Sequence, residues 1–292
     1  MKAKLTGTGV ALVTPFHKDG SIDFKSFRKL IEHCISGNAD YLVPLGTTGE
    51  SVTLTKDEKR AVIDFVIDVN EKRLPVVLGL GGNNTSEIIN CMEDYPLREV
   101  SAILSVSPYY NKPSQRGLVQ HYKAIANASS VPVIIYNVPS RTSVNITADT
   151  TLLLAEEMKN IIGVKEASGN FDQCMRILKN KPKDFLFISG DDALTFPLIS
   201  LGCDGVISVV ANAFPKEFSE MVWLAREGNF ERARKIHYKL LTFTNLLFAE
   251  GSPPGIKAAL SMLGISQEHL RLPLVGVSKT TWNKIEAEIK LI

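Results

Sequence analysis

Residues 161–170, IIGVKEASGN, place an amine at the end of an apolar segment that is followed directly by turn-forming residues. Short apolar runs of this kind predict a buried strand. Alternation along that strand puts Lys165 on the same face as Gly163 and Ile161, whereas Glu166 faces the opposite side. The lysine and the neighbouring glutamate therefore need not neutralise each other.

Lys165 has two interpretations from these residues alone. A lysine that faces an enclosed interior loses hydration, which favours its free amine, and a free amine is a nucleophile. Alternatively, the side chain extends from the end of the strand into water or forms an ordinary ion pair. The flanking sequence has to decide between a catalytic and a structural lysine.

Strand-like segments alternate with segments of helical period on both sides of this stretch, without a compositional break to about Gly228. A capping box at Thr55 and Glu58 predicts the start of one of these helices. Besides the lysine segment, strands are predicted over residues 9–14, 41–45, 75–79, 101–106, 131–137, 185–189 and 205–210.

Eight strand–helix units joined by right-handed crossovers either wind an open sheet or close into a barrel. A doubly wound sheet commonly carries a glycine-rich phosphate loop after its first strand, where this chain has Pro15, Phe16 and His17. The sequence therefore predicts an α/β fold of the (β/α)8 TIM-barrel type, with its site at the carboxyl ends of the strands.

The pattern changes to helices alone after residue 228, with helical segments over residues 230–247, 253–263 and 279–289. We expect residues 1–228 to form the barrel, as the catalytic domain, and residues 229–292 to form a C-terminal helical extension. This extension is expected to pack on the barrel or on a neighbouring subunit.

Composition limits the classes of partner. Lys and Arg number 33 and Asp and Glu 31, and this balance disfavours nucleic acid or an anionic membrane as the partner. No apolar run approaches the roughly 18 residues of a membrane span, and no secretory signal begins the chain. The four scattered cysteines indicate a reducing compartment, and we expect a cytoplasmic protein: Cys34, Cys91, Cys174 and Cys203.

Metal and nucleotide motifs are not found. The five histidines never pair at metal-ligand spacing, so no metal is predicted. Residues 79–84, GLGGNN, lack the last glycine of a dinucleotide-binding loop. Asp191 and Asp192 could ligate a cation, but they are better explained as caps that open a helix.

Reactive side chains follow four of the predicted strands and would converge if the barrel closes. Such a set suits carbonyl chemistry, because the amine can condense with a keto group, hydroxyls can relay protons and arginine can grip a carboxylate. Each residue taken singly also has a structural explanation as a turn, packing or solvated residue. The set comprises Thr47, Thr48, Tyr109, Tyr110, Tyr136, Arg141 and Lys165.

Five motifs in order resemble the dihydrodipicolinate synthases, a family within the Schiff-base-forming class I aldolase superfamily that also contains N-acetylneuraminate lyase. They are GTTGES at 46–51, PYYNKP at 108–113, YNVPSRT at 136–142, GVKEA at 163–167 and SGDD at 189–192. They span nearly the whole chain, so the resemblance favours the catalytic interpretation of Lys165.

The resemblance implies a hydro-lyase of lysine and diaminopimelate biosynthesis that needs no cofactor. Lys165 would form an imine with pyruvate, whose enamine attacks L-aspartate-4-semialdehyde, and the adduct cyclises. Tyr136 matches the proton-transfer tyrosine, Thr47 the hydroxyl that links two tyrosines, and Tyr110 the tyrosine donated across a dimer interface. The family also implies a homotetramer built from tight dimers.

The remaining matches concern substrate binding. Thr48 matches a pyruvate-carboxylate position, Arg141 the group for the semialdehyde carboxylate, and Gly190 and Ile207 main-chain positions of the pocket. Arg141 and the paired threonines separate the chain from N-acetylneuraminate lyase. Relatives that act on other 2-keto acids share the lysine, so another pyruvate-dependent lyase or aldolase is the first alternative. A catalytically silent ligand-binding relative is the second.

A regulatory pocket for the end product lysine is also implied, at Ser51, Asn83, Glu87 and Tyr109. This chain departs from the inhibited relatives at Lys56 and Lys59, where they commonly carry histidine or another residue that is not lysine. Extra ammonium groups repel a lysine cation at close range. We therefore expect weak or absent feedback inhibition.

Overall fold

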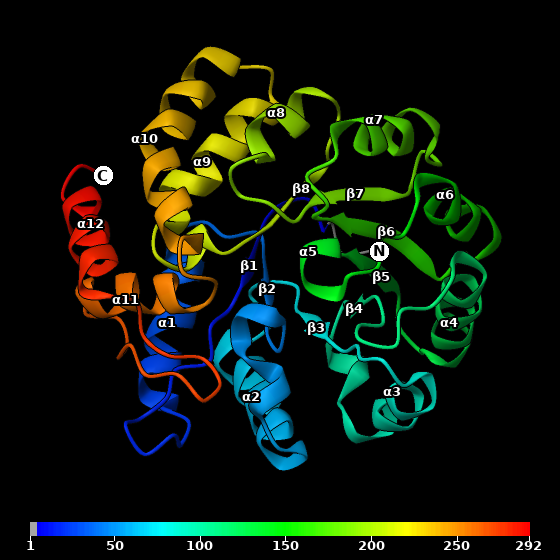
Figure 1. Ribbon diagram of the computed structural model, residues 1–292, viewed down its shortest axis with the longest axis horizontal. Helices are drawn as coiled ribbons and strands as arrows, with labels where there is room; N and C mark the ends of the chain where they lie inside the picture. Colours follow the sequence, from blue (N-terminus) through cyan, green and yellow to red (C-terminus); the bar gives the residue numbers. More distant parts are fainter. Residues whose placement is uncertain (1–4) are drawn as a thin grey trace.

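Eight parallel strands form the centre of the molecule (Figure 1), and the computed structural model describes residues 5–292. In space they run β2-β1-β8-β7-β6-β5-β4-β3. The two outermost strands meet, because Leu42 bridges to Val76 and the Gly79 N–H donates to the Pro44 carbonyl at 2.9 Å. The predicted closed barrel is confirmed. The strands are β1 (Gly7–Ala11), β2 (Tyr41–Val43), β3 (Val77–Gly79), β4 (Ala102–Val106), β5 (Val133–Asn137), β6 (Ile161–Glu166), β7 (Leu186–Ser189) and β8 (Gly205–Ser208).

Helices surround the strands on the outside of the barrel (Figure 1). Local sequence fixes where several of them begin: the predicted capping box is present, with the Thr55 side chain accepting from the Glu58 N–H. The barrel helices are α1 (Phe24–Ser36), α2 (Lys56–Asn70), α3 (Thr85–Cys91), α4 (Gln115–Ala128), α5 (Pro139–Thr142), α6 (Ala148–Glu157), α7 (Phe171–Asn180), α8 (Thr195–Ser200) and α9 (Pro215–Arg226).

Two apolar cores result from the alternation of side chains along the strands. The inner core fills the barrel and includes Tyr41, Ile134 and Ile188, while the outer core lies between strands and helices. On β6, Val164 belongs to the outer core, whereas Lys165 pairs in register with Tyr136 and Ile188, two inner-core residues. Lys165 therefore faces the interior of the barrel, as its catalytic interpretation requires.

The start of β6 differs from the expectation. Ile161 lies in the outer core and Ile162 packs against the inner one, so the prediction that Ile161 shares the face of Lys165 is wrong. The cause is a shift in register between Val133 and Ile134 of the paired strand β5. An irregularity of this kind inserts one residue and reverses the alternation before it.

Three further helices follow the barrel: α10 (Phe230–Phe248), α11 (Pro254–Met262) and α12 (Lys279–Ile289). They lie together beside α1 and α9 at the orange and red end of the chain (Figure 1). α10 packs against α8 and α9, and α12 packs against α10 and α11. The three predicted helices are confirmed within two residues at each end, and we keep the name C-terminal extension for residues 229–292.

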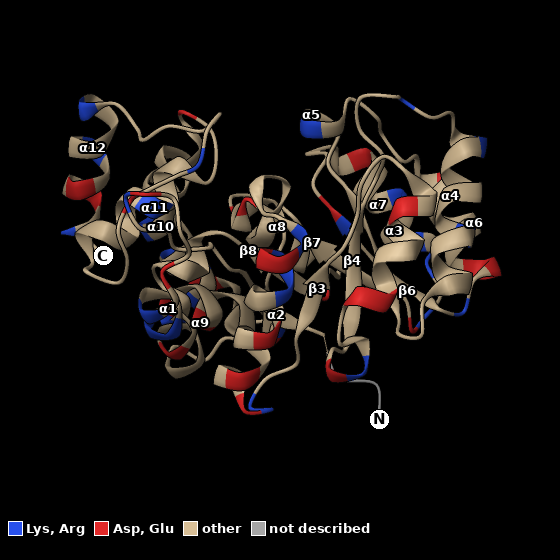
Figure 2. Ribbon diagram, turned by 90° about the horizontal axis from the view of Figure 1, so that it is seen from below, with Lys and Arg blue, Asp and Glu red and all other residues tan. Residues whose placement is uncertain are grey.

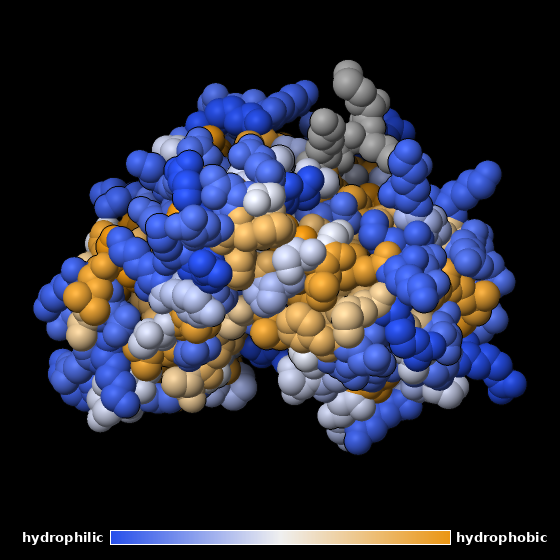
Figure 3. Space-filling model, turned by 90° about the horizontal axis from the view of Figure 1, so that it is seen from above, coloured by the Kyte–Doolittle hydropathy of each residue, from blue (hydrophilic) through white to orange (hydrophobic). Residues whose placement is uncertain are grey.

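The surface carries both signs of charge, interspersed over the helices (Figure 2). Apolar areas lie between hydrophilic ones on the face shown in Figure 3. Over the described residues, no helix combines the length and the apolar character needed to cross a membrane. All four cysteines are free thiols, and three of them are buried.

Candidate active site

A cavity of about 200 Å³ lies at the carboxyl ends of the strands. It is where the predicted catalytic and substrate-binding residues meet, with one exception described below. The strands and the loops after β2, β5, β6 and β7 all contribute to its wall. The predicted residues in this lining are Thr47, Thr48, Tyr136, Arg141, Lys165, Gly190 and Ile207.

Lys165 enters the cavity from β6 with only 6% of its surface exposed. Its Nζ lies 4.3 Å from the centre of the Tyr136 ring, which belongs to the adjacent strand β5. On the opposite face, the Glu166 carboxylate accepts hydrogen bonds from Asn137 Nδ2 at 2.9 Å and Gln173 Nε2 at 3.0 Å. Lys165 and Glu166 are therefore on opposite faces of β6, as the alternation predicted, and the amine faces the cavity.

Gly190 gives Lys165 its room. A Cβ at this position would lie 2.6 Å from the Ala167 Cβ and 3.1 Å from the Lys165 Cε. Such contacts are closer than packed carbon atoms tolerate. The absence of a side chain after β7 is thus required mainly by Ala167, and it also leaves space for the stem of Lys165.

The two threonines come from the turn after β2, which forms the short 3₁₀ helix η1 (Thr47–Gly49). Thr48 is buried and Thr47 is exposed, and both line the cavity. The Thr14 hydroxyl donates to the Gly49 carbonyl at 2.7 Å and so ties this turn to the chain after β1. Ile207 closes the cavity from β8.

Arg141 lies in α5, a four-residue helix with proline at its first position. This helix is too short for its sequence to show helical periodicity. The Arg141 Nη2 donates to the carbonyl of Ser252 at 3.2 Å, and Ser252 belongs to the C-terminal extension. Arg141 thus lines the cavity while it is bonded to the C-terminal extension.

Tyr110 is not brought to the site of its own chain. Its side chain is 89% exposed, and it lines neither this cavity nor the adjoining one. Its backbone has a positive φ of 71°, which is uncommon for a residue with a side chain. Tyr110 therefore does not contribute to the cavity of its own chain.

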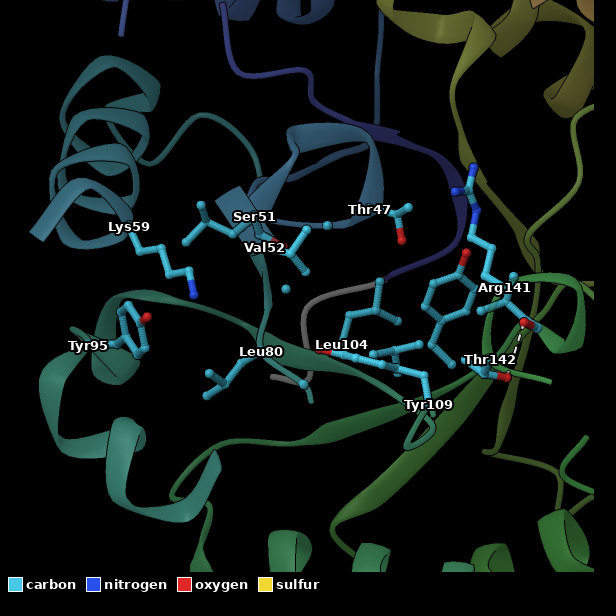
Figure 4. A pocket seen from close by; sticks show the side chains of 17 residues that line it. Thr47, Ser51, Val52, Lys59, Leu80, Tyr95, Leu104, Tyr109, Arg141 and Thr142 are labelled. Carbon is cyan, nitrogen blue, oxygen red and sulfur yellow. Dashed lines mark hydrogen bonds between the residues drawn. The ribbon is translucent and has the colours of Figure 1, made fainter. Parts of the chain in front are cut away.

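A second cavity, of about 280 Å³, adjoins the first and shares Thr47, Tyr136 and Arg141 with it. Lys59 and Arg141 lie at opposite sides of it, and the Lys59 side chain extends toward Tyr95 (Figure 4). None of the residues that line this cavity carries a carboxylate.

The predicted regulatory residues are only partly brought together. Ser51 and Tyr109 line the second cavity, and Asn83 supports it by donating to the Tyr109 carbonyl at 3.1 Å. Glu87 lines a different surface hollow, together with Lys56. The Lys56 Nζ pairs there with Asp94 at 2.9 Å, so of the two lysines only Lys59 faces the cavity.

Sequence reasoning missed the contribution of the C-terminal extension to the site. Phe248 at the end of α10 and Ser252 after it both line the cavity of Lys165. The one available signal was the break at residues 251–254, GSPP, which marks a turn but not its location in space.

The prediction for Asp192 as a helix cap is wrong. α8 begins only at Thr195, and the Asp192 Oδ2 instead accepts from the Val209 N–H at 2.9 Å, after β8. Burial raises the pKa of Asp192 to about 6. Asp191 accepts from the Ala193 N–H at 3.0 Å and so caps the turn before α8.

A metal centre finds no support in this part of the chain: among residues 5–292, no three His, Cys, Asp or Glu side chains are placed to hold an ion. The chemistry that the site can perform is that of an amine, hydroxyls and a guanidinium around a small cavity. This combination fits the capture of a small keto acid.

The family model of the dihydrodipicolinate synthetase family matches residues 4–292. A relative from Parabacteroides distasonis, named 4-hydroxy-tetrahydrodipicolinate synthase, is 51% identical over 286 residues, which are 98% of this chain and 96% of the relative. The crystal structure of dihydrodipicolinate synthase from Aquifex aeolicus is 42% identical with a TM-score of 0.95, covering 98% of this chain and 97% of that one.

A structure described as a monomeric dihydrodipicolinate synthase variant is 37% identical with a TM-score of 0.95, covering 98% of this chain and 96% of that one. Likeness in sequence and in structure thus extends over nearly the full length on both sides. The chain belongs to the dihydrodipicolinate synthetase family.

Proposed function

We propose that this chain condenses pyruvate with L-aspartate-4-semialdehyde to give 4-hydroxy-tetrahydrodipicolinate, through an imine on Lys165. The observation that carries the proposal is the buried amine of Lys165 against the Tyr136 ring, in a cavity that also holds Thr48 and Arg141. The full-length family match supports the same activity.

The chemistry follows from these groups. The Lys165 amine adds to the keto carbon of pyruvate and water leaves, which gives the imine without any external cofactor. Loss of a methyl proton gives an enamine, whose carbon attacks the aldehyde, and the aldehyde oxygen takes up a proton. The amino group of the second substrate then displaces Lys165 and closes the ring. Tyr136 and Thr47 are the hydroxyls we assign to the proton transfers.

Two carboxylates have to be held during this sequence. We assign the pyruvate carboxylate to Thr48, with Gly190 and Ile207 as the adjoining wall, and the semialdehyde carboxylate to Arg141, whose planar fork suits it. Arg141 disfavours the alternative activity of N-acetylneuraminate lyase. A catalytically silent ligand-binding role is disfavoured because the amine, hydroxyls and guanidinium are all in one cavity.

The proposal is tested by trapping. Incubation of the protein with pyruvate and borohydride is expected to give one covalent adduct, located on Lys165 by peptide mass spectrometry. Addition of L-aspartate-4-semialdehyde without borohydride is expected to give the cyclised product, measured by coupling to its reduction. An adduct on another lysine contradicts the mechanism, and an adduct without turnover of the semialdehyde favours an aldolase of different specificity.

We infer that Tyr110 completes the site of a second copy, in a homotetramer assembled from tight dimers. Its exposed side chain supports this assembly. We also place the reaction in the cytoplasm, a reducing compartment, because all four cysteines are free thiols.

We further propose that the second cavity is a poor site for L-lysine. The ammonium of Lys59 is the charge that faces its outer part, with no carboxylate in the lining to attract a cationic side chain. Two like charges about 4 Å apart repel by roughly 1 kcal/mol even in water, about a fivefold loss in affinity.

L-Lysine is therefore expected to leave the initial rate unchanged at micromolar concentrations, measured with saturating pyruvate. Lys59→Gln is expected to strengthen any inhibition at millimolar lysine about fivefold or more. Lys56→Gln is the matched control, since Lys56 pairs with Asp94 outside the cavity. A micromolar inhibition constant for the unmodified protein would sink the proposal.

A further inference from the structure

One ion pair is completely buried at the border between the barrel and the C-terminal extension. Glu50, directly after η1, is 2% exposed, and Lys257 of α11 is 0% exposed. The Lys257 Nζ contacts the Glu50 Oε1, donates to the His269 carbonyl at 2.9 Å and lies 4.1 Å from the centre of the Phe16 ring. Both charges are thus held among fixed partners.

Arg271, in the connection between α11 and α12, forms further hydrogen bonds to Glu50 and to the residues that follow it. Its backbone N–H donates to the Glu50 Oε2 at 3.1 Å. Its Nη1 donates to the Thr53 carbonyl at 2.8 Å and to the Glu58 Oε2 at 2.8 Å. The segment from η1 to the start of α2 is therefore fastened to the C-terminal extension at three points.

Stability alone is a weak explanation for this arrangement. Removing two charges from water costs about as much as their attraction returns, so a buried pair contributes little net stability relative to apolar packing. Burial lowers the pKa of Lys257 to about 8, which reflects that cost. In some proteins a buried pair instead fixes one register for the segments it joins, and this is the role we consider for Glu50 and Lys257.

The backbone conformation of Glu50 indicates that the turn containing Thr47 and Thr48 is the segment held in place. Glu50 has φ 52° and ψ 34°, the left-handed region that is unfavourable for a residue with a side chain. Such a conformation persists only where the surroundings fix it. Thr47 and Thr48 precede this residue in the same turn, so the orientation of both cavity threonines depends on where the Glu50 side chain is anchored.

We propose that Glu50, Lys257 and Arg271 are positioning residues that orient Thr47 and Thr48, and that the C-terminal extension is thereby part of the active site. The contact of the same extension with Arg141, through the Ser252 carbonyl, supports this role on the other side of the cavity. The inference rests on the proposed function, because it assigns a purpose to the two threonines.

The test compares Lys257→Met with the double variant Glu50→Gln/Lys257→Met. The single variant leaves a buried carboxylate without its cation, so its Tm is expected to fall. The double variant removes both charges, so most of that Tm is expected to return. In both, kcat is expected to fall about 10- to 100-fold and the KM for pyruvate to rise, because displaced groups lose their alignment. Borohydride trapping on Lys165 at saturating pyruvate is expected to persist.

A merely structural pair would give a different pattern, in which the double variant regains kcat together with Tm. That result overturns the inference. Arg271→Lys supplies an independent variant if Lys257→Met does not fold, and wild-type kcat and KM in this variant also overturn it. Arg73→Met is the matched control, because Arg73 forms a two-bond pair with Glu32 away from the cavity, and its kcat is expected to be unchanged. Failure of trapping in the unmodified protein would instead contradict the proposed function.

Discussion

Replacement of Lys165 by methionine is expected to abolish the pyruvate adduct and to lower kcat by at least about 10³-fold. Methionine retains the apolar stem beside Tyr136 but has no amine to attack the keto carbon. The remaining groups can still bind carboxylates, but they cannot provide the covalent route, and removal of one member of such a set costs nearly the whole effect. Borohydride trapping followed by mass spectrometry measures the adduct, and a coupled assay measures kcat.

Lys181 offers a matched control for this variant. It is partly buried, pairs with Asp204 at 3.3 Å and donates to the Phe185 carbonyl, all outside the cavity. Lys181→Met is expected to retain the adduct on Lys165 and the full kcat, with some loss of Tm. Substantial activity in Lys165→Met, or trapping on the buried Lys257, would show that the wrong amine has been assigned.

Tyr136→Phe is expected to lower kcat by about 10²- to 10³-fold while the pyruvate adduct still forms. The phenyl ring preserves the contact with the Lys165 Nζ, and the only group lost is the hydroxyl that we assign to proton transfer. General acid–base groups contribute rate factors of about this size. Single-turnover trapping at several pH values measures how much slower the adduct appears.

The control for this substitution is another buried tyrosine. The Tyr122 hydroxyl donates to the Ser105 carbonyl at 3.0 Å and does not line the cavity. Tyr122→Phe is expected to cost about 1 kcal/mol of unfolding free energy, the usual value of one hydrogen bond, with kcat unchanged. Equal losses of kcat in the two variants would mean that the Tyr136 hydroxyl acts through packing and not through proton transfer.

The fold was predictable because its signals are local: apolar runs, helical periods and caps such as Thr55. The ends of the strands were less predictable because pairing partners decide them. The first strand was expected over residues 9–14, yet β1 spans Gly7–Ala11, since Gly7 and Thr8 pair with β8. That partner lies about 200 residues further along the chain, and no local pattern records it.

The candidate site likewise contains residues that the sequence could predict and residues that it could not. The lysine, tyrosine and threonines follow strands, so closure of the barrel alone brings them together. Phe248 and Ser252 line the cavity, and Lys257 contacts Glu50, only because the C-terminal extension packs against the barrel. The role proposed for Glu50 could not be predicted for the same reason. Glu50 belongs to the motif GTTGES, but its partner Lys257 lies about 200 residues later in the chain.

The irregular start of β6 has a consequence for protein engineering. The pairing with β5 skips Ile162, because Val133 pairs with Ile161 and Ile134 with Gly163, and from Gly163 onward regular alternation delivers the amine to the interior. A transplant of this strand into another barrel must therefore keep the pairing of residues 163–166 with its neighbour, whereas deleting Ile162 would make the strand regular and leave Lys165 inside. Deleting Val164 instead would turn the nucleophile toward the surrounding helices, where no substrate can reach it.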